Sequence, residues 1–137
     1  MGLTVLDAGV IIGFLDANDA HHATARVALG DARDRNDRLA IPASVFAEIL
    51  VGPSRKGTDA VAAVRDLVDR VPIDIAPLDA EIAVAAAALR ARHRSLKLPD
   101  ALVIATAGHL DADHLVTTDR NWPSQSKLEL TTSIRQI

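Results

Sequence analysis

The fold class is decided by residues 3–15, LTVLDAGVIIGFL. The first four of these residues form a short β-type run that ends in Asp7, and Val10, Ile11 and Phe14 then recur at helical spacing. A strand that passes directly into a helix is the repeating unit of α/β proteins. The alternation continues along the chain, with further strands expected at 39–41, 73–75, 115–118 and 128–131, and helices expected at 20–31 (capped by Asp19), from Pro42 to Gly52-Pro53, at 60–71, at 80–94 (capped by Asp79) and at 101–110.

Strands that alternate with single or paired helices predict a three-layer α/β/α sandwich with a mainly parallel central sheet. No internal repeat, low-complexity tract or linker divides the 137 residues, so we expect one domain over residues 1–137. Hydrophobic residues make up 49% of the chain and charged residues 24%, which is typical of soluble globular proteins and excludes a disordered chain.

Composition also limits the chemistry. The chain has no cysteine, which excludes disulfides, zinc–thiolate sites, iron–sulfur clusters and a cysteine nucleophile. The N-terminus lacks a basic leader and no stretch reaches about 18 uncharged apolar residues, so we expect a cytoplasmic protein without a membrane partner. With a net charge of −3 and only three aromatic side chains, the protein has neither a global basic field nor a base-stacking platform.

Four acidic residues stand in unusual places. Asp7 ends the first apolar strand, Glu48 is the only charge in the segment VFAEILV, Asp100 opens an apolar helix, and Asp119 ends the strand at 115–118. The carboxyl ends of parallel strands and the N-termini of the following helices meet at one edge of the sheet. We therefore expect all four carboxylates to converge there.

Each acid also has a purely structural interpretation. Asp7 is a good helix cap, Asp100 is favoured by the helix dipole in a first turn, and Asp119 suits a turn. Glu48 could pair with an arginine. Together, however, the four favour a metal site, because carboxylates in a low-dielectric site repel one another unless a cation joins them. Oxygen ligands without neighbouring histidine or cysteine suit Mg²⁺ or Mn²⁺, which support phosphodiester cleavage.

Other polar residues are weaker candidates. Thr117 and Thr118 could orient a water or an acid, or could simply favour the strand. Arg90, Arg94 and Lys97 precede Asp100; Arg90 and Arg94 are expected on one helix face, where they could contact phosphates or form a solvated surface.

The histidines are less informative. The segment from His109 to His114 contains metal-ligand residue types, but it spans a loop between a helix and a strand. His21 and His22 are adjacent, so on a helix they point about 100° apart and cannot chelate one ion together.

The order and setting of the four acids resemble those of PIN-domain ribonucleases, and more narrowly of VapC-type toxins of bacterial toxin–antitoxin pairs. The resemblance runs from about Val5 to Trp122, where Trp122 stands at a position that is usually bulky in the family. One difference is Gly9, at a position where the family commonly has Ser, Thr or Asn. The matching stretches are Leu6 to Ile12, Ala43 to Ile49, Leu98 to Ala107 and Leu115 to Asp119.

The resemblance implies a Mg²⁺- or Mn²⁺-dependent endoribonuclease with Asp7, Glu48, Asp100 and Asp119 as catalytic and metal-binding residues, and it places Thr117 at a supporting hydroxyl position. It further implies a homodimer and a cognate VapB-type antitoxin that covers the active site. With so few aromatic residues, we expect the substrate to be a structured RNA recognised by shape.

Two alternatives remain. A PIN-like module with a decayed site would only bind RNA or a protein, which Gly9 favours slightly and the four acids oppose. A phosphotransfer domain or phosphatase could use a similar sheet, but a haloacid-dehalogenase-like enzyme needs Asp-x-Asp where this chain has Asp7-Ala8-Gly9.

Overall fold

The computed structural model describes residues 1–137 and shows a central sheet of five parallel strands in the order β3-β2-β1-β4-β5. Every neighbouring pair of strands is parallel, so the predicted α/β class with a parallel sheet is confirmed. The strands are β1 (Leu3–Leu6), β2 (Arg38–Pro42), β3 (Ile73–Ala76), β4 (His114–Thr117) and β5 (Ser133–Gln136).

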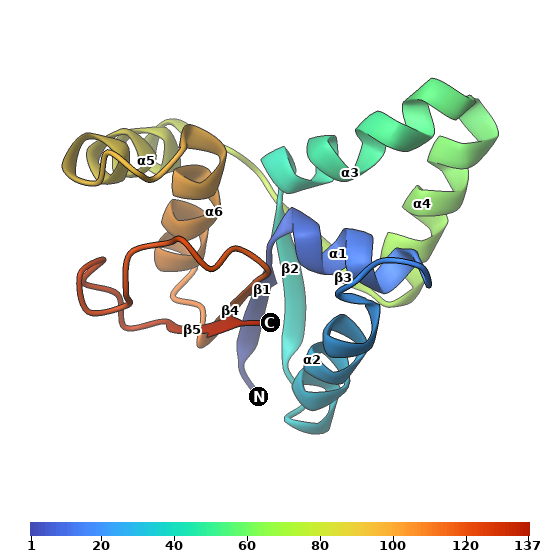
Figure 1. Ribbon diagram of the computed structural model, residues 1–137, viewed down its shortest axis with the longest axis horizontal. Helices are drawn as coiled ribbons and strands as arrows, with labels where there is room; N and C mark the ends of the chain where they lie inside the picture. Colours follow the sequence, from blue (N-terminus) through green and yellow to red (C-terminus); the bar gives the residue numbers. More distant parts are fainter.

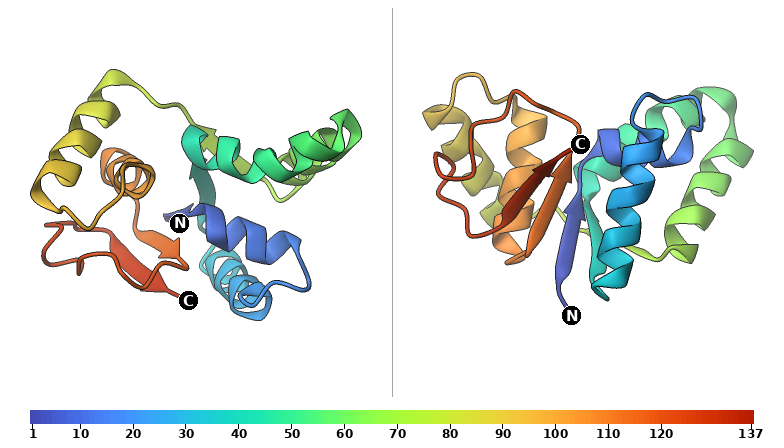
Figure 2. Two further views of the ribbon diagram at one scale, coloured as in Figure 1. Left: turned by 45° about the horizontal axis from the view of Figure 1, so that its top comes forward. Right: turned by 60° about the horizontal axis from the view of Figure 1, so that its bottom comes forward.

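Six helices cover the two faces of this sheet. Figures 1 and 2 show α1 to α4 on one side and α5 with α6 on the other. Right-handed crossovers explain this distribution, because the chain moves outward from β1 to β2 and β3 and then returns past β1 to β4. The helices are α1 (Ala8–Leu15), α2 (His22–Asp34), α3 (Ala43–Lys56), α4 (Thr58–Arg70), α5 (Ala80–Arg92) and α6 (Leu98–His109).

The core lies between the central strands and the helices. Leu6, Ile41 and Leu115 are fully buried on β1, β2 and β4. Helix α6 buries residues on most of its circumference, including Val103 and Ile104, which confirms the prediction of a central helix. No helix of the protein is both long enough and apolar enough to cross a membrane.

Helix α3 is longer than predicted. It was expected to end at Gly52-Pro53, but it continues through Pro53 to Lys56. Pro53 lies at the start of the last turn, and its carbonyl accepts a hydrogen bond from Gly57 N–H at 3.1 Å. The helix ends at Gly57, whose φ of 132° is a conformation that glycine alone adopts readily.

Helix α2 begins later than predicted. Asp19 does not cap it; its carboxylate instead accepts from His21 N–H at 2.8 Å within a turn, and the helix starts at His22. Val27, whose apolar side chain was expected to face inward, is 56% exposed. The buried stripe of α2 runs through Ala25, Ala28, Leu29 and Ala32, and at 100° per residue Val27 lies on the opposite side of the helix.

The last strand is also displaced. Residues 128–131 form no strand; Leu128 and Glu129 lie in a turn, with Glu129 at a φ of 56°. The edge strand is β5, which pairs with β4 from His114↔Ser133 to Thr117↔Gln136. Edge strands are half exposed and show little hydrophobic periodicity, so the sequence pattern was weak here. By contrast, the predicted cap of α5 is confirmed, because the Asp79 carboxylate accepts from Ile82 N–H at 2.9 Å.

Candidate functional site

The strand order has its reversal point between β1 and β4. The chain leaves β1 toward β2, on one side, and comes back to β4 on the other. In parallel α/β sheets, ligands bind beyond the carboxyl ends of the strands at such a point. Asp7 follows β1 directly and Asp119 lies two residues beyond β4, so both acids lie at this point.

Asp7 is the most buried of the four acids, with 8% of its surface exposed. Its Oδ1 accepts from Ala8 N–H at 2.7 Å, so it does cap α1. Its Oδ2 accepts from the Thr117 hydroxyl, also at 2.7 Å. Burial raises the pKa of Asp7 above its ordinary value; the two hydrogen bonds oppose this rise, and the charge of Asp119 adds to it.

Thr117 connects the two strand-end acids. It is fully buried, and its Oγ1 both donates to Asp7 Oδ2 and accepts from Asp119 N–H at 3.0 Å. This hydroxyl therefore orients the side chain of one acid and the backbone of the other. The supporting role of Thr117 in the site stays a prediction, and these contacts are the geometry on which it would depend.

Asp100 belongs to a helix. It lies in the first turn of α6 and is half-buried. Burial raises its pKa most, and the charges of Asp7 and Asp119 raise it further. Two neighbours lower it: Trp122, whose buried indole N–H faces the carboxyl without forming a hydrogen bond of ordinary geometry, and the charge of Lys97.

Glu48, on α3, is the most exposed of the four acids, and no arginine pairs with it. The arginine pairing left open by the sequence is therefore absent. Even so, partial burial raises the pKa of Glu48, and the charges of Asp7 and Asp100 add to the rise. The fold thus brings all four acids within electrostatic reach of one another.

The four acids lie near one another, but their side chains do not form a tight cluster. As the side chains stand, no three acidic or histidine residues of the protein form a group that could hold a metal ion. The donor set nevertheless fits a hard divalent cation, because it consists of carboxylate oxygens whose negative charges no salt bridge offsets. An ion held here would involve rotation of side chains, which the exposed Glu48 can make most easily.

The basic stretch is arranged differently from the prediction. Arg90 lies on α5, but the helix ends at Arg92 and Arg94 is in the following turn, so the two arginines do not share a helix face. The apolar pattern of α5 gave no clear stop, and the turn before α6 begins at His93. Of the three residues, Lys97 is the one whose charge reaches an acid, namely Asp100.

The histidines lie outside this group. His109 is 3.8 Å from Asp79 and 3.9 Å from Glu81, near the start of α5, and His22 Nδ1 bonds to the Gly13 carbonyl at 2.8 Å. No histidine is among the groups whose charges act on Asp7, Glu48 or Asp100.

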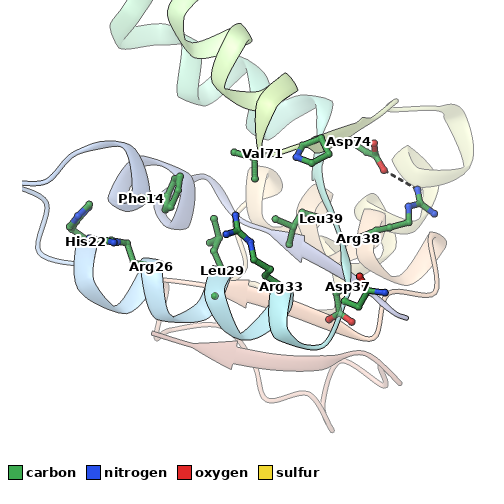
Figure 3. Close-up of a pocket in the computed structure, with 13 residues that line it drawn as sticks. Phe14, His22, Arg26, Leu29, Arg33, Asp37, Arg38, Leu39, Val71 and Asp74 are labelled. Carbon is green, nitrogen blue, oxygen red and sulfur yellow. Dashed lines mark hydrogen bonds and ion pairs between the residues drawn. The ribbon is translucent and has the colours of Figure 1, made fainter.

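A pocket of about 850 Å³, which the sequence did not predict, lies away from the four acids (Figure 3). It is bounded by α1, α2, β2 and the end of α4, with Phe14, Leu29 and Leu39 among its apolar residues. Arg26 and Arg33 of α2 also line it and form no salt bridge, whereas Arg38 is paired with Asp74 at 2.9 Å. The only sequence signal was the spacing of Arg26 and Arg33, which puts both on one helix face.

Comparisons with known proteins agree with the fold. The PIN domain family model matches residues 4–128. No curated protein sequence matches the chain.

Three solved structures are similar to the fold. VapBC2 from Rickettsia felis, bound to a DNA fragment from its promoter, has a TM-score of 0.73 and 17% identity, with 98% of each chain covered. A toxin–antitoxin complex from Klebsiella pneumoniae has a TM-score of 0.66 and 24% identity over 86% of this chain and 88% of that chain. VapC20 from Mycobacterium tuberculosis, described as a sarcin–ricin loop cleaving toxin, has a TM-score of 0.67 and 18% identity over 86% and 91%. Since the family model spans nearly the whole chain and the fold agrees with it, the chain belongs to the PIN domain family.

Proposed function

We propose that this protein is a Mg²⁺- or Mn²⁺-dependent endoribonuclease, the toxin of a VapBC-type toxin–antitoxin pair. The observation that carries the proposal is the gathering of Asp7, Glu48, Asp100 and Asp119 at the reversal point of the sheet, where no salt bridge offsets their charges. Perturbed pKa values cluster at functional sites, so the raised pKa values of these acids support the proposal.

The four carboxylates would hold the ion, which when bound would neutralise charge at the phosphate and acidify a water molecule. The chain's own residues have distinct parts in this arrangement. Thr117 fixes Asp7 and the backbone of Asp119. Lys97, whose charge already acts on Asp100, lies where an RNA phosphate would meet a positive charge.

We propose a structured RNA as the substrate. None of the three aromatic side chains is exposed: Trp122 is buried, and Phe14 and Phe46 are half-buried. Sequence readout of single-stranded RNA relies on exposed aromatic rings, so recognition here would use shape and phosphate contacts. One structural neighbour, VapC20 from Mycobacterium tuberculosis, is described as a toxin that cleaves the sarcin–ricin loop.

We further propose a VapB-type antitoxin as partner, since several structural neighbours are such complexes. The uncompensated acids would attract a guanidinium, whose planar fork matches carboxylates, so the antitoxin is expected to insert an arginine among them. The pocket in Figure 3 offers a second contact, where the unpaired Arg26 and Arg33 suit an acidic segment beside apolar residues.

A homodimer is also proposed. The exposed large apolar side chains of the protein include Leu78 before α5, Val84 on α5 and Leu98 at the start of α6. Contact between two copies would bury them. Light scattering of the native chain and of Val84→Asp tests this, and a monomeric native chain would contradict it.

The deciding experiment incubates the purified protein with total RNA, with Mg²⁺ or with EDTA. We expect cleavage only with Mg²⁺, and none by Asp100→Asn. Asp59→Asn is the matched control, because Asp59 also lies in a first helical turn, that of α4, and is exposed.

The chemical ends of the products test the mechanism. No histidine charge acts on the acids, so a water is the expected nucleophile rather than the RNA 2′-hydroxyl, and the products should carry 5′-phosphate and 3′-hydroxyl ends. A 2′,3′-cyclic phosphate would refute this mechanism. The alternative, a decayed module that only binds RNA or protein, predicts no cleavage and no response to Mg²⁺.

A further inference from the structure

Gly9 and Thr118 are in direct contact. Gly9 lies in the first turn of α1, two residues after Asp7, and Thr118 lies between Thr117 and Asp119. A Cβ atom at Gly9 would overlap Thr118 Oγ1 and lie 3.2 Å from both Cβ and Cγ2 of Thr118. The side chain of Thr118 therefore occupies the space that any side chain at position 9 would need.

The backbone does not require glycine at this position. Gly57 is the only glycine with a positive φ, and Gly9 lies within a regular helix. Glycine is a poor helix former because it loses more backbone freedom than other residues. Its presence in α1 is therefore explained by packing against Thr118.

The two neighbouring threonine hydroxyls differ in their partners. The Thr117 hydroxyl is fully buried and bonds to both Asp7 and Asp119. The Thr118 side chain is partly exposed, and its hydroxyl makes no hydrogen bond within the protein. A hydroxyl with a free donor and free acceptor sites thus lies against the first turn of α1, next in the chain to Asp119.

We propose that Thr118 is a positioning residue of the acidic site, whose hydroxyl takes the place of a polar side chain at position 9 and bonds to a water carried by the divalent cation. This inference rests on the proposed function. Mg²⁺ bound by carboxylates keeps several of its water ligands, and those waters need hydrogen-bond partners in the protein. Asp7, Thr117 and Thr118 would then act together, with the first two fixing an acid and the third fixing a water.

The packing half of the proposal is tested in EDTA, where no cation contributes. Gly9→Ser should lower the melting temperature, because its Cβ would overlap Thr118 Oγ1. Gly9→Ser with Thr118→Ala should melt higher than Gly9→Ser alone, because Oγ1 and Cγ2 are gone. Gly52→Ser in α3 is the control, since a Cβ there meets nothing within 4 Å. If Gly9→Ser melts no lower than Gly52→Ser, or if the double variant melts no higher than Gly9→Ser, the steric pairing is wrong.

The hydroxyl is tested by titrating Mn²⁺ into the metal-free protein and measuring affinity by calorimetry and by thermal shift. Thr118→Val keeps the outline of the side chain without its hydroxyl and should bind Mn²⁺ roughly two- to tenfold more weakly, as expected for one lost hydrogen bond. Thr118→Ser should bind like the native chain, and Gly9→Ser with Thr118→Ala should bind more tightly than Thr118→Ala alone.

The outcomes separate this inference from the proposed function. Unchanged Mn²⁺ affinity in Thr118→Val, with a native chain that binds Mn²⁺, would overturn the role of Thr118 only. A native chain that does not respond to Mn²⁺ would overturn both. The melting temperatures in EDTA report on the Gly9–Thr118 contact in either case.

Discussion

Thr117 Oγ1 donates a 2.7 Å hydrogen bond to Asp7 Oδ2, which joins two residues 110 positions apart in the chain. The contact is possible because β1 and β4 are adjacent parallel strands in which Leu6 is paired with Val116, so Asp7 and Thr117 are the next residues on each strand path. The same oxygen accepts from Asp119 N–H at 3.0 Å. One buried hydroxyl thereby sets the geometry of both strand-end acids.

Replacing this hydroxyl should affect stability and the site together. Thr117→Val leaves Asp7 Oδ2 and Asp119 N–H without their partner, and we expect a loss of about 1–3 kcal/mol in the free energy of unfolding together with weaker Mg²⁺ binding and cleavage. Thr117→Ser should retain most of the stability and most of the Mg²⁺ binding and cleavage. Urea unfolding and RNA cleavage measure the two effects.

The matched control is Thr4→Val. Thr4 is also fully buried, and its hydroxyl donates to Asp37 Oδ2 at 2.9 Å, away from the four acids. It should lose stability without losing Mg²⁺ binding. If both variants lose Mg²⁺ binding equally, the effect of Thr117 is merely structural.

The stability of the metal-free protein should rise on mild acidification. Burial and mutual repulsion raise the pKa of Asp7, Glu48 and Asp100, so the folded state binds more protons than the unfolded state between the ordinary carboxylate pKa and the folded pKa. Stability therefore rises as the pH falls through the folded pKa and levels off below the unfolded one. Urea midpoints in EDTA, from pH 7 downward, measure the rise.

The contribution of Asp37 to the pH dependence of stability has the opposite sign. Burial would raise its pKa, but hydrogen bonds from Thr4 and Arg35 and the charge of Arg35 lower it overall, so its contribution is lost only as the pH falls below the ordinary value of 3.8. The difference in urea midpoint between the native chain and Asp100→Asn cancels the contributions of titrating groups that both proteins share. A native midpoint that falls from pH 7 to pH 5 relative to Asp100→Asn would contradict the repulsion.

Neutralising Asp100 should stabilise the metal-free protein while removing its response to Mg²⁺. Asp100→Asn relieves the burial and repulsion of a carboxylate whose pKa is raised, so its melting temperature in EDTA should be a few degrees above that of the native chain. Mg²⁺ should then raise the native melting temperature and leave the variant nearly unchanged. Asp59→Asn, in the first turn of α4, should melt slightly lower and keep the Mg²⁺ response. If Asp100→Asn behaves like Asp59→Asn, Asp100 is only a first-turn acid.

Lys97, Arg90 and Arg94 are expected to contact RNA phosphates. Removing one such contact should weaken binding evenly across RNA sequences and reduce the slope of log K against log salt by about 0.7 to 0.9. Lys97→Ala should show the largest effect, because its charge already reaches the site. Arg70→Ala, an exposed arginine on α4, is the control. If variants of Lys97, Arg90 and Arg94 all have the same salt slope as Arg70→Ala, the basic stretch is only a solvated surface.

Mg²⁺ and the antitoxin should compete for the same carboxylates. An arginine inserted among Asp7, Glu48, Asp100 and Asp119 occupies the oxygens that would hold the ion, so high Mg²⁺ should weaken the complex. Titration of the cognate antitoxin at rising MgCl₂, with NaCl matched for ionic strength, measures this competition. An affinity that depends on ionic strength alone would exclude it.

The α/β class and the places of Asp7, Asp100 and Asp119 were predictable from the sequence, because they depend on local pattern. Apolar runs of period two and of helical period reveal strands and helices, and in a parallel sheet every strand end and the following helix start fall on one edge. The acids at those boundaries therefore had to lie on that edge in any parallel arrangement.

What the tertiary structure alone decided depends on which distant segments become neighbours. The strand order β3-β2-β1-β4-β5 could not be predicted from the sequence pattern. This order places β4 beside β1, and it thereby brings Thr117 to Asp7 and Thr118 to Gly9. It also did not reveal the exposure of Glu48, the end of α3 at Gly57 or the strand at Ser133–Gln136. Register and packing are set by the joint fit of many side chains, and no single stretch of sequence carries that information.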